Sequence, residues 1–281
     1  MALHRVKVGT DANGRIVGWQ HKVVSQSIFM NTPFERISVK DGIDLSSIEG
    51  IIDTPYAISD LSISVLHPKS PVPVLWFRSV GHNHTAHVME IMMDELSHLS
   101  GKDPVAFHLD LLAQKPRDAA VVRLAAEKSG WGTPLPGGRG RGLAYHYSFN
   151  TRVAMIAEVA VEKSILRVDR VVVAVDCGVA INPDVVTAQL EGAIGFVLSS
   201  VLRNRITLNK GVVEQSNFDE YEPTRMREMP KVEVHIVKST ERPSGIGEPG
   251  VPPLAPAIGN AIFAATGMRM RSLPFDMKTL A

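Results

Sequence analysis

The chain has 281 residues, 44% of them hydrophobic, and a formal net charge of +1 at pH 7. This length and composition are enough to bury a sizeable core, in one large domain or two smaller ones, and they exclude intrinsic disorder. The nearly neutral charge, without runs of Lys or Arg, excludes the basic surface that nucleic acid or an anionic membrane requires.

The cysteine content and the short apolar stretches argue against a disulfide-linked, an iron–sulfur or a membrane-spanning protein. Cys177 is the one cysteine, so the chain forms no internal disulfide and supplies no thiolate set for an iron–sulfur cluster. The longest apolar stretch, around 193–202, is short and flanked by polar residues, and the first residues lack the pattern of a signal peptide. We therefore expect no membrane partner, and any iron–sulfur cluster must sit on another chain.

The first 80 residues are predicted to be rich in β-strands. Apolar residues at 6–8 and 16–19 flank a turn at 11–14, which predicts a hairpin, and a third alternating segment covers 61–65. From Asn83 the apolar spacing becomes helical as far as Leu99, and Gly101 stands at the position of a C-terminal cap. Asp103 followed by Pro104 predicts the start of a second helix, and a third runs to Gly130, so 83–130 form a helical block.

Gly and Pro dominate the segment TPLPGGRGRG, which predicts a linker over 133–142. Beyond it, 153–161 and 166–175 predict a hairpin, the second strand being covered on both faces. Asn182-Pro183 predicts a helix start, 232–236 one more strand, and 256–267 a final helix. We expect an α+β fold of mixed sheets with helices, in two subdomains, 1–132 and 143–281.

The loop GIGEPG is the first candidate for chemistry. It holds one acid, Glu248, between Gly247 and Pro249-Gly250, just before an apolar helix. A stiff loop with small side chains lets a ligand approach the backbone and holds a carboxylate in one place, as a general base requires. By itself, however, an acid in a Pro/Gly loop is more often a solvated turn residue.

Two further groups of polar residues have competing interpretations. His82, His84 and His87 with Glu90 suggest a zinc site, although their spacing fits poorly and loop or capping roles are the commoner outcome. Gln189, in an apolar helix near Gly192, either binds a polar ligand or faces solvent.

Four segments together resemble the molybdenum-binding subunit of the xanthine oxidase and aldehyde oxidase family, most closely the isoquinoline 1-oxidoreductase type. The segments are LWFRSVGHNHTAHVMEIMMDEL, VDCGVAINPDVVTAQLEGAIGF, QSNFDEYEPTRMREMPKVEVHIV and SGIGEPGVPPLAPAIGNAIFAATG. They span most of the chain in the family's order. The resemblance implies the C-terminal part of a molybdenum-dependent oxidoreductase that hydroxylates an aldehyde or an N-heteroaromatic compound, with water as the oxygen source.

The resemblance also implies roles for individual residues. In the family, a glutamate in a GEP loop removes a proton from a molybdenum-bound hydroxyl, and Glu248 matches it. Gln189 matches a residue that hydrogen-bonds the pterin, Gly192 packs closely against it, and Arg78 matches an arginine near substrate and cofactor. Gly247, beside the catalytic glutamate, is assigned to cofactor binding, and the chain itself is expected to contribute no metal ligand.

The sequence departs from the family in lacking the upstream Gly-rich motifs that contact the pterin, a GGxFGxK-like and a GQG-like segment. We therefore expect the cofactor, molybdenum–pterin cytosine dinucleotide or a related molybdopterin, to require an N-terminal half of the subunit, with a [2Fe-2S] subunit receiving the electrons. The alternatives are a non-catalytic fragment of such a subunit, or a zinc hydrolase built on the histidines. Cytoplasmic location is expected, or periplasmic if the upstream part carries an export signal.

Overall fold

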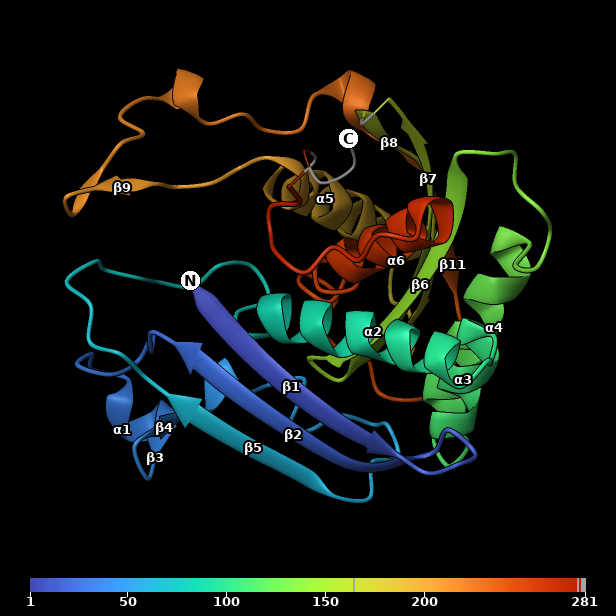
Figure 1. Cartoon of the computed structure of the whole chain (residues 1–281), viewed down its shortest axis with the longest axis horizontal. Coiled ribbons are helices and arrows are strands. Elements are labelled where there is room, and N and C mark those ends of the chain that lie inside the picture. Colours follow the sequence, from blue (N-terminus) through green and yellow to red (C-terminus); the bar gives the residue numbers. More distant parts are fainter. Residues whose placement is uncertain (164, 277, 279–281) are drawn as a thin grey trace. The chain divides into compact units, whose positions relative to one another are not determined.

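The computed structural model describes residues 1–163, 165–276 and 278 (Figure 1). The chain divides into two compact units, Met1–Ala119 (unit 1) and Ala120–Ala281 (unit 2). The elements that begin in unit 1 are β1 (Ala2–Thr10), β2 (Ile16–Ser25), α1 (Glu35–Ser38), β3 (Val39–Lys40), β4 (Ile43–Asp44), β5 (Leu61–Leu66), α2 (His82–Leu99), α3 (Pro104–Leu111) and α4 (Pro116–Ser129), which continues into unit 2. Those of unit 2 are β6 (Arg139–Ser148), β7 (Thr151–Glu162), β8 (Ile165–Asp176), α5 (Pro183–Leu202), β9 (Leu208–Asn209), β10 (Val212–Val213), β11 (Lys231–Ile236) and α6 (Leu254–Thr266).

Unit 1 is built on the sheet β1-β2-β5. The predicted hairpin is confirmed: β1 and β2 pair antiparallel, and the Asp11 carboxylate accepts hydrogen bonds from the Asn13 and Arg15 amides in the turn between them. The third predicted segment becomes β5, which pairs parallel with β2. Alternate residues of β2, from Trp19 to Ser25, are buried, so one face of the sheet belongs to the core.

The helical block of unit 1 also follows its sequence signals. α2 ends at Leu99, and Gly101 has a φ of 65°, the left-handed conformation that glycine adopts without steric cost. The Asp103 carboxylate accepts a hydrogen bond from the Ala106 amide at the start of α3, and Pro104 occupies the first turn. Both predicted caps are confirmed.

Unit 2 contains the four-stranded sheet β11-β8-β7-β6, in which β8 pairs antiparallel with β7 and parallel with β11. Helices α5 and α6 pack on one face of this sheet and build the main core with it (Figure 1). Residues 171–175 of β8 are fully buried on both faces, as predicted. Mixed sheets with helices confirm the α+β prediction.

The segment predicted as a linker differs from expectation, because its last four residues, Arg139 to Gly142, lie in β6. A Cβ added to Gly142 would lie 2.1 Å from the Ala261 amide nitrogen in α6, and one added to Gly140 would lie 2.1 Å from the Ala261 carbonyl oxygen. These glycines therefore let α6 pack directly on the strand. The two compact units also divide at 119/120 rather than at 133–142.

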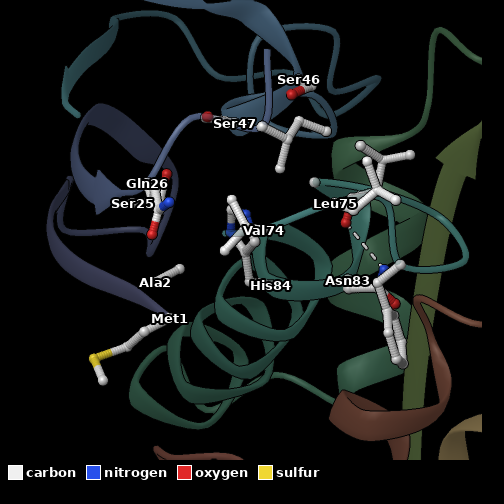
Figure 2. Close-up of a pocket in the computed structure, with 14 residues that line it drawn as sticks. Met1, Ala2, Ser25, Gln26, Ser46, Ser47, Val74, Leu75, Asn83 and His84 are labelled. Atoms are coloured by element: carbon white, nitrogen blue, oxygen red, sulfur yellow. Dashed lines mark hydrogen bonds between the residues drawn. The ribbon is translucent and has the colours of Figure 1, made fainter. Parts of the chain in front are cut away.

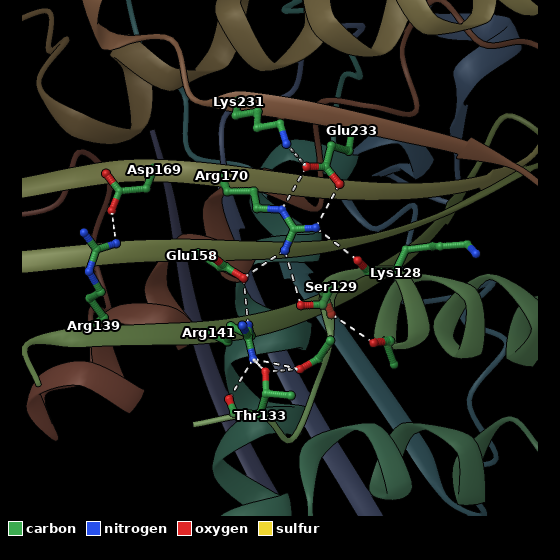
Figure 3. Close-up of polar contacts among 12 residues, drawn as sticks. Lys128, Ser129, Thr133, Arg139, Arg141, Glu158, Asp169, Arg170, Lys231 and Glu233 are labelled. Carbon is green, nitrogen blue, oxygen red and sulfur yellow. Dashed lines mark hydrogen bonds and ion pairs between the residues drawn. The ribbon is translucent and has the colours of Figure 1, made fainter. Parts of the chain in front are cut away.

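Arginines on the other face of the sheet join the strands to the end of α4 (Figure 3). Arg170 on β8 contacts Glu158 on β7 and Glu233 on β11, at 3.1 and 2.8 Å. Arg141 on β6 also binds Glu158, at 2.8 Å. Arg170 donates further hydrogen bonds to the Ser129 and Lys128 carbonyls at the C-terminus of α4. The cationic groups thereby satisfy carbonyls that the helix leaves unpaired.

α5 begins where the sequence predicts, with the Asn182 side chain accepting hydrogen bonds from the Asp184 and Val185 amides. By length and composition alone this helix could cross a membrane. That is weak evidence for a span, because apolar core helices pass the same test and α5 buries Leu190, Ile194 and its other inward residues in the core of unit 2.

Candidate active site

The loop 241–250, which contains GIGEPG, is fastened to the end of β8. The Val179 amide donates a hydrogen bond to the Glu241 carbonyl, and the Ser244 amide donates one to the Cys177 carbonyl, both at 2.9 Å. Gly178 between them has a φ of 72°, and a Cβ there would lie 2.1 Å from the Arg242 carbonyl oxygen. The VDCG sequence therefore allows a close backbone contact that holds the start of the loop.

Thr151, the first residue of β7, holds the loop one step further along. Its fully buried hydroxyl donates a hydrogen bond to the Gly245 carbonyl at 2.6 Å and lies 2.7 Å from the Ser244 hydroxyl. Since a hydroxyl carries one proton, Thr151 accepts from Ser244 while it donates to Gly245. Sequence reasoning missed this residue, because only the tertiary structure places it beside a loop more than 90 positions away.

The GEPG turn itself packs on α5. The Val251 amide donates a hydrogen bond to the Glu248 carbonyl at 3.0 Å, which closes the turn. A Cβ on Gly250 would lie 2.9 Å from Ala193 Cβ and 3.5 Å from Leu190 Cα, so the loop backbone contacts the helix at these positions. The half-buried Glu248 thus lies two residues from a contact with the helix that carries Gln189.

Gln189 lies on an exposed stripe of α5. Val185, Gln189, Gly192 and Phe196 follow the spacing of one helix face, and each is exposed or half-buried. A Cβ on Gly192 or Gly247 would meet no atom within 4 Å, so both backbones are open to a ligand. A side-chain amide beside accessible backbone fits one side of a binding site for a polar heterocycle such as a pterin.

Arg78, the remaining predicted residue, lies half-buried in unit 1, whereas Gln189, Gly192, Gly247 and Glu248 lie in unit 2. Its carbonyl accepts a hydrogen bond from the Asn83 side chain at 2.7 Å. The next residues, Ser79 and Val80, both have positive φ, 78° and 47°. Two such non-glycine residues in succession store backbone strain, which proteins keep mainly at functional sites.

The predicted histidine group does not assemble into a metal site. His82 lies 3.4 Å from Glu49, His84 binds His4, and Glu90 accepts hydrogen bonds from Tyr56 and His108. The described part of the chain holds no group of three His, Cys, Asp or Glu side chains that could bind a metal ion. The zinc interpretation is therefore wrong, because His82, His84 and Glu90 each contact a different residue instead of converging on one point.

Glu90 and His108 form a buried pair that sequence reasoning missed. The two side chains, 1% and 0% exposed, are 3.1 Å apart. Burial disfavours the His108 cation, but the hydrogen bond and the charge of Glu90 outweigh burial and raise the pKa of His108. Tyr56 donates to the other Glu90 oxygen at 2.7 Å, so the pair ties α2 to α3 and to the chain that precedes β5.

Comparison with known proteins assigns the family. Residues 83–230, more than half of the chain, match the model of the molybdopterin cofactor-binding domain. The chain is 39% identical over 217 residues to the isoquinoline 1-oxidoreductase beta subunit of Brevundimonas diminuta, a match that covers 75% of this chain and 28% of that protein. It is 32% identical over 307 residues to a membrane-bound aldehyde dehydrogenase of Gluconacetobacter polyoxogenes, covering 97% of this chain and 39% of that protein.

The chain therefore spans less than half the length of these two relatives. Quinoline 2-oxidoreductase from Pseudomonas putida 86 has a similar fold, with a TM-score of 0.79 at 10% identity, over 95% of this chain and 59% of that one. The resemblance seen in the sequence motifs is confirmed. The chain belongs to the family of molybdopterin cofactor-binding domains, as part of a molybdenum-binding subunit.

Proposed function

We propose that this chain forms the C-terminal part of the molybdenum-binding subunit of a hydroxylase that oxidises an aldehyde or an N-heteroaromatic compound with water as the oxygen source. The names of the relatives, an isoquinoline oxidoreductase and an aldehyde dehydrogenase, support these two substrate classes. The observation that carries the proposal is the GEPG turn, fastened to β7 and β8 and packed on the helix of Gln189.

Glu248 is the proposed general base. The loop is anchored at Gly245 and at Gly250, so the backbone that carries the Glu248 carboxylate is held in place, as a general base requires. The molybdenum cofactor, when bound, supplies the reactive oxygen and accepts the electrons from the substrate carbon. The chain contributes the proton acceptor and its orientation, and a base held in place removes the entropic cost of positioning it in each turnover.

Four further residues are proposed to hold a molybdenum–pterin cytosine dinucleotide or a related molybdopterin. Gln189 would hydrogen-bond the pterin, and Gly192 and Gly247 would admit it close to the backbone. Arg78 of unit 1 is proposed as a further cofactor-binding residue. Relatives two to three times longer supply the rest of their sites from segments that this chain does not include. The proposed partners are accordingly an N-terminal half of the subunit and a [2Fe-2S] subunit that passes electrons on, in a cytoplasmic assembly.

The proposal is tested on the assembled enzyme. The chain is co-expressed with an upstream half that carries the Gly-rich motifs and with an iron–sulfur subunit, and bound molybdenum and dye-linked oxidation of aldehydes and N-heteroaromatics are measured. We expect Glu248→Gln to keep the bound molybdenum and to lower kcat about 10²- to 10⁴-fold, the range for loss of a general base. Gln189→Leu is expected to lower the molybdenum content itself.

Glu241→Gln is the matched control, because Glu241 is an exposed acid of the same loop and the substitution keeps the backbone carbonyl that accepts the hydrogen bond from Val179. It should keep both molybdenum and turnover. Undiminished turnover in Glu248→Gln at wild-type molybdenum content would refute the base assignment. An assembly without molybdenum would favour the non-catalytic alternative.

A further inference from the structure

The sheet of unit 1 has an inner face toward α2 and an outer face toward solvent. On the inner face, His4 of β1 lies 2.9 Å from His84 of α2, and Ala2 and Ser25 of the strands line a cavity together with His84 (Figure 2). On the outer face, the alternating residues of β1, β2 and β5 are mostly exposed. The outer face is therefore the one that unit 1 leaves open to a partner.

The pairing of the strands gathers three cations on this outer face. Arg5 on β1 lies directly opposite Lys22 on β2, and Lys7 follows Arg5 by two residues on the same face. All three side chains are exposed, and within the described residues none of them forms an ion pair or a side-chain hydrogen bond. Like charges directly opposite each other destabilise a sheet, so this arrangement weakens the hairpin unless an anionic group faces it.

A hollow follows the cations along the same face. Gly9 on β1 lies opposite Gly18 on β2, two residues beyond Lys7, and a Cβ at Gly18 would meet no atom within 4 Å. The hollow has a volume of about 540 Å³, and Lys7, Asp60 and Ser62 are among the residues that line it. This is room enough for one aromatic side chain, and a ring laid over sheet glycines supplies contacts that they cannot make themselves.

We propose that the outer face of this sheet docks an extended strand of a separate protein, in which two acidic residues and one aromatic residue stand at alternate positions. Alternate residues of an extended chain share a face and lie about 7 Å apart, the spacing at which Arg5, Lys7 and Gly9 follow one another along β1. One carboxylate would face Arg5 and Lys22, the second would face Lys7, and the ring would cover the glycine pair.

The composition of the outer face favours this occupant over others. Permanent interfaces are mostly apolar, whereas the middle of this face holds the three cations with Gln20, Ser62 and Ser64, which fits a partner that binds and leaves. A second copy would bring the same cations together and be repelled. Nucleic acid is commonly held by about 6–10 phosphate contacts, more than this face offers. The inference stands on unit 1 alone and does not depend on Glu248.

The first test titrates the full chain with the peptide TETETFT and with TQTQTFT, in which glutamine replaces both glutamates. TETETFT should bind about tenfold more tightly at low salt, because three exposed ion pairs each contribute modestly, and the preference should vanish at about 0.5 M salt. Its NMR shifts should fall on residues 3–9 and 18–24. Equal affinities at low salt, or shifts confined to other residues, would overturn the proposal.

A charge reversal separates docking from stability. Lys22→Glu should abolish the preference for TETETFT, yet slow hydrogen exchange of the β1 and β2 amides by up to about fivefold, because opposite charges would then face each other across the hairpin. Lys115→Glu is the matched control, since Lys115 is an exposed lysine between α3 and α4, and it should change neither quantity. A preference that survives Lys22→Glu would overturn the proposal.

The place of the ring is tested at the glycine pair. Gly18→Leu should fill the hollow and remove the advantage of TETETFT over TETETTT, which lacks the ring, while the preference for glutamate over glutamine remains. An advantage of the ring that survives this change would overturn the proposal. If a variant fails to fold, the three peptides measured on the wild-type chain decide.

Two further measurements test other occupants. Lys7 and Lys22 should stay reactive toward an acylating reagent when the chain is co-expressed with the upstream half of the subunit, because the proposed occupant is a separate protein. Protection of both lysines by that half would overturn the proposal. Tight binding to phosphatidylglycerol vesicles that Lys22→Glu abolishes would overturn it as well, in favour of a lipid surface.

Discussion

Gly142→Ala should detach α6 from the sheet of unit 2. The new methyl group would lie 2.1 Å from the Ala261 amide nitrogen and 2.3 Å from the Ala257 carbonyl oxygen, whereas ordinary contact begins at 3.4 Å. The obstacle is helix backbone, which cannot turn aside as a side chain does, so α6 would have to retreat by more than 1 Å. Overpacking of a core typically lowers the free energy of unfolding by about 1–3 kcal/mol. Because the clash here is with backbone, we expect a loss near the upper end of that range.

The assay is hydrogen exchange of the α6 amides, residues 254–266. A loss of about 3 kcal/mol corresponds to roughly a hundredfold faster exchange through opening of the helix. Gly18→Ala in β2 is the control, since a Cβ at Gly18 meets no atom within 4 Å, and it should leave exchange in α6 unchanged. Wild-type protection of α6 in Gly142→Ala would refute the packing argument.

Three other predictions follow from single contacts. Thr151→Val should speed hydrogen exchange in the loop 241–250, because the Gly245 carbonyl loses its donor, and Thr151→Ser should restore wild-type exchange. Because the pKa of His108 is raised in the folded state, its pairing with Glu90 contributes fully to stability below pH 6.5 and loses this contribution as the pH rises through the folded-state pKa. In His108→Gln, the free energy of unfolding in urea should therefore change less with pH above 6.5. Hydrogen bonds from Arg170 and Lys231 lower the pKa of Glu233 to about 2, so wild-type stability should fall between pH 4.5 and 2, and less so in Glu233→Gln.

Local signals were sufficient to predict most of the elements. The alternation of β2, the cap at Asp103 and the Asn182-Pro183 start of α5 each depend on residues within one or two turns of the chain. The interpretation of GGRGRG as a linker is wrong for Arg139 to Gly142, because glycine is typical of both a flexible segment and a strand against which a helix backbone packs. Only the position of α6 over Gly142 distinguishes the two.

The sequence by itself determined most of the elements, the family and the candidate base Glu248, because caps, periodicity and motifs depend on residues close together along the chain. The tertiary structure decided which distant groups meet. It placed Thr151 beside Gly245, and His4 beside His84, across about 80 to 95 positions. Such contacts depend on how strands and helices pack, and no local pattern in the sequence encodes that packing.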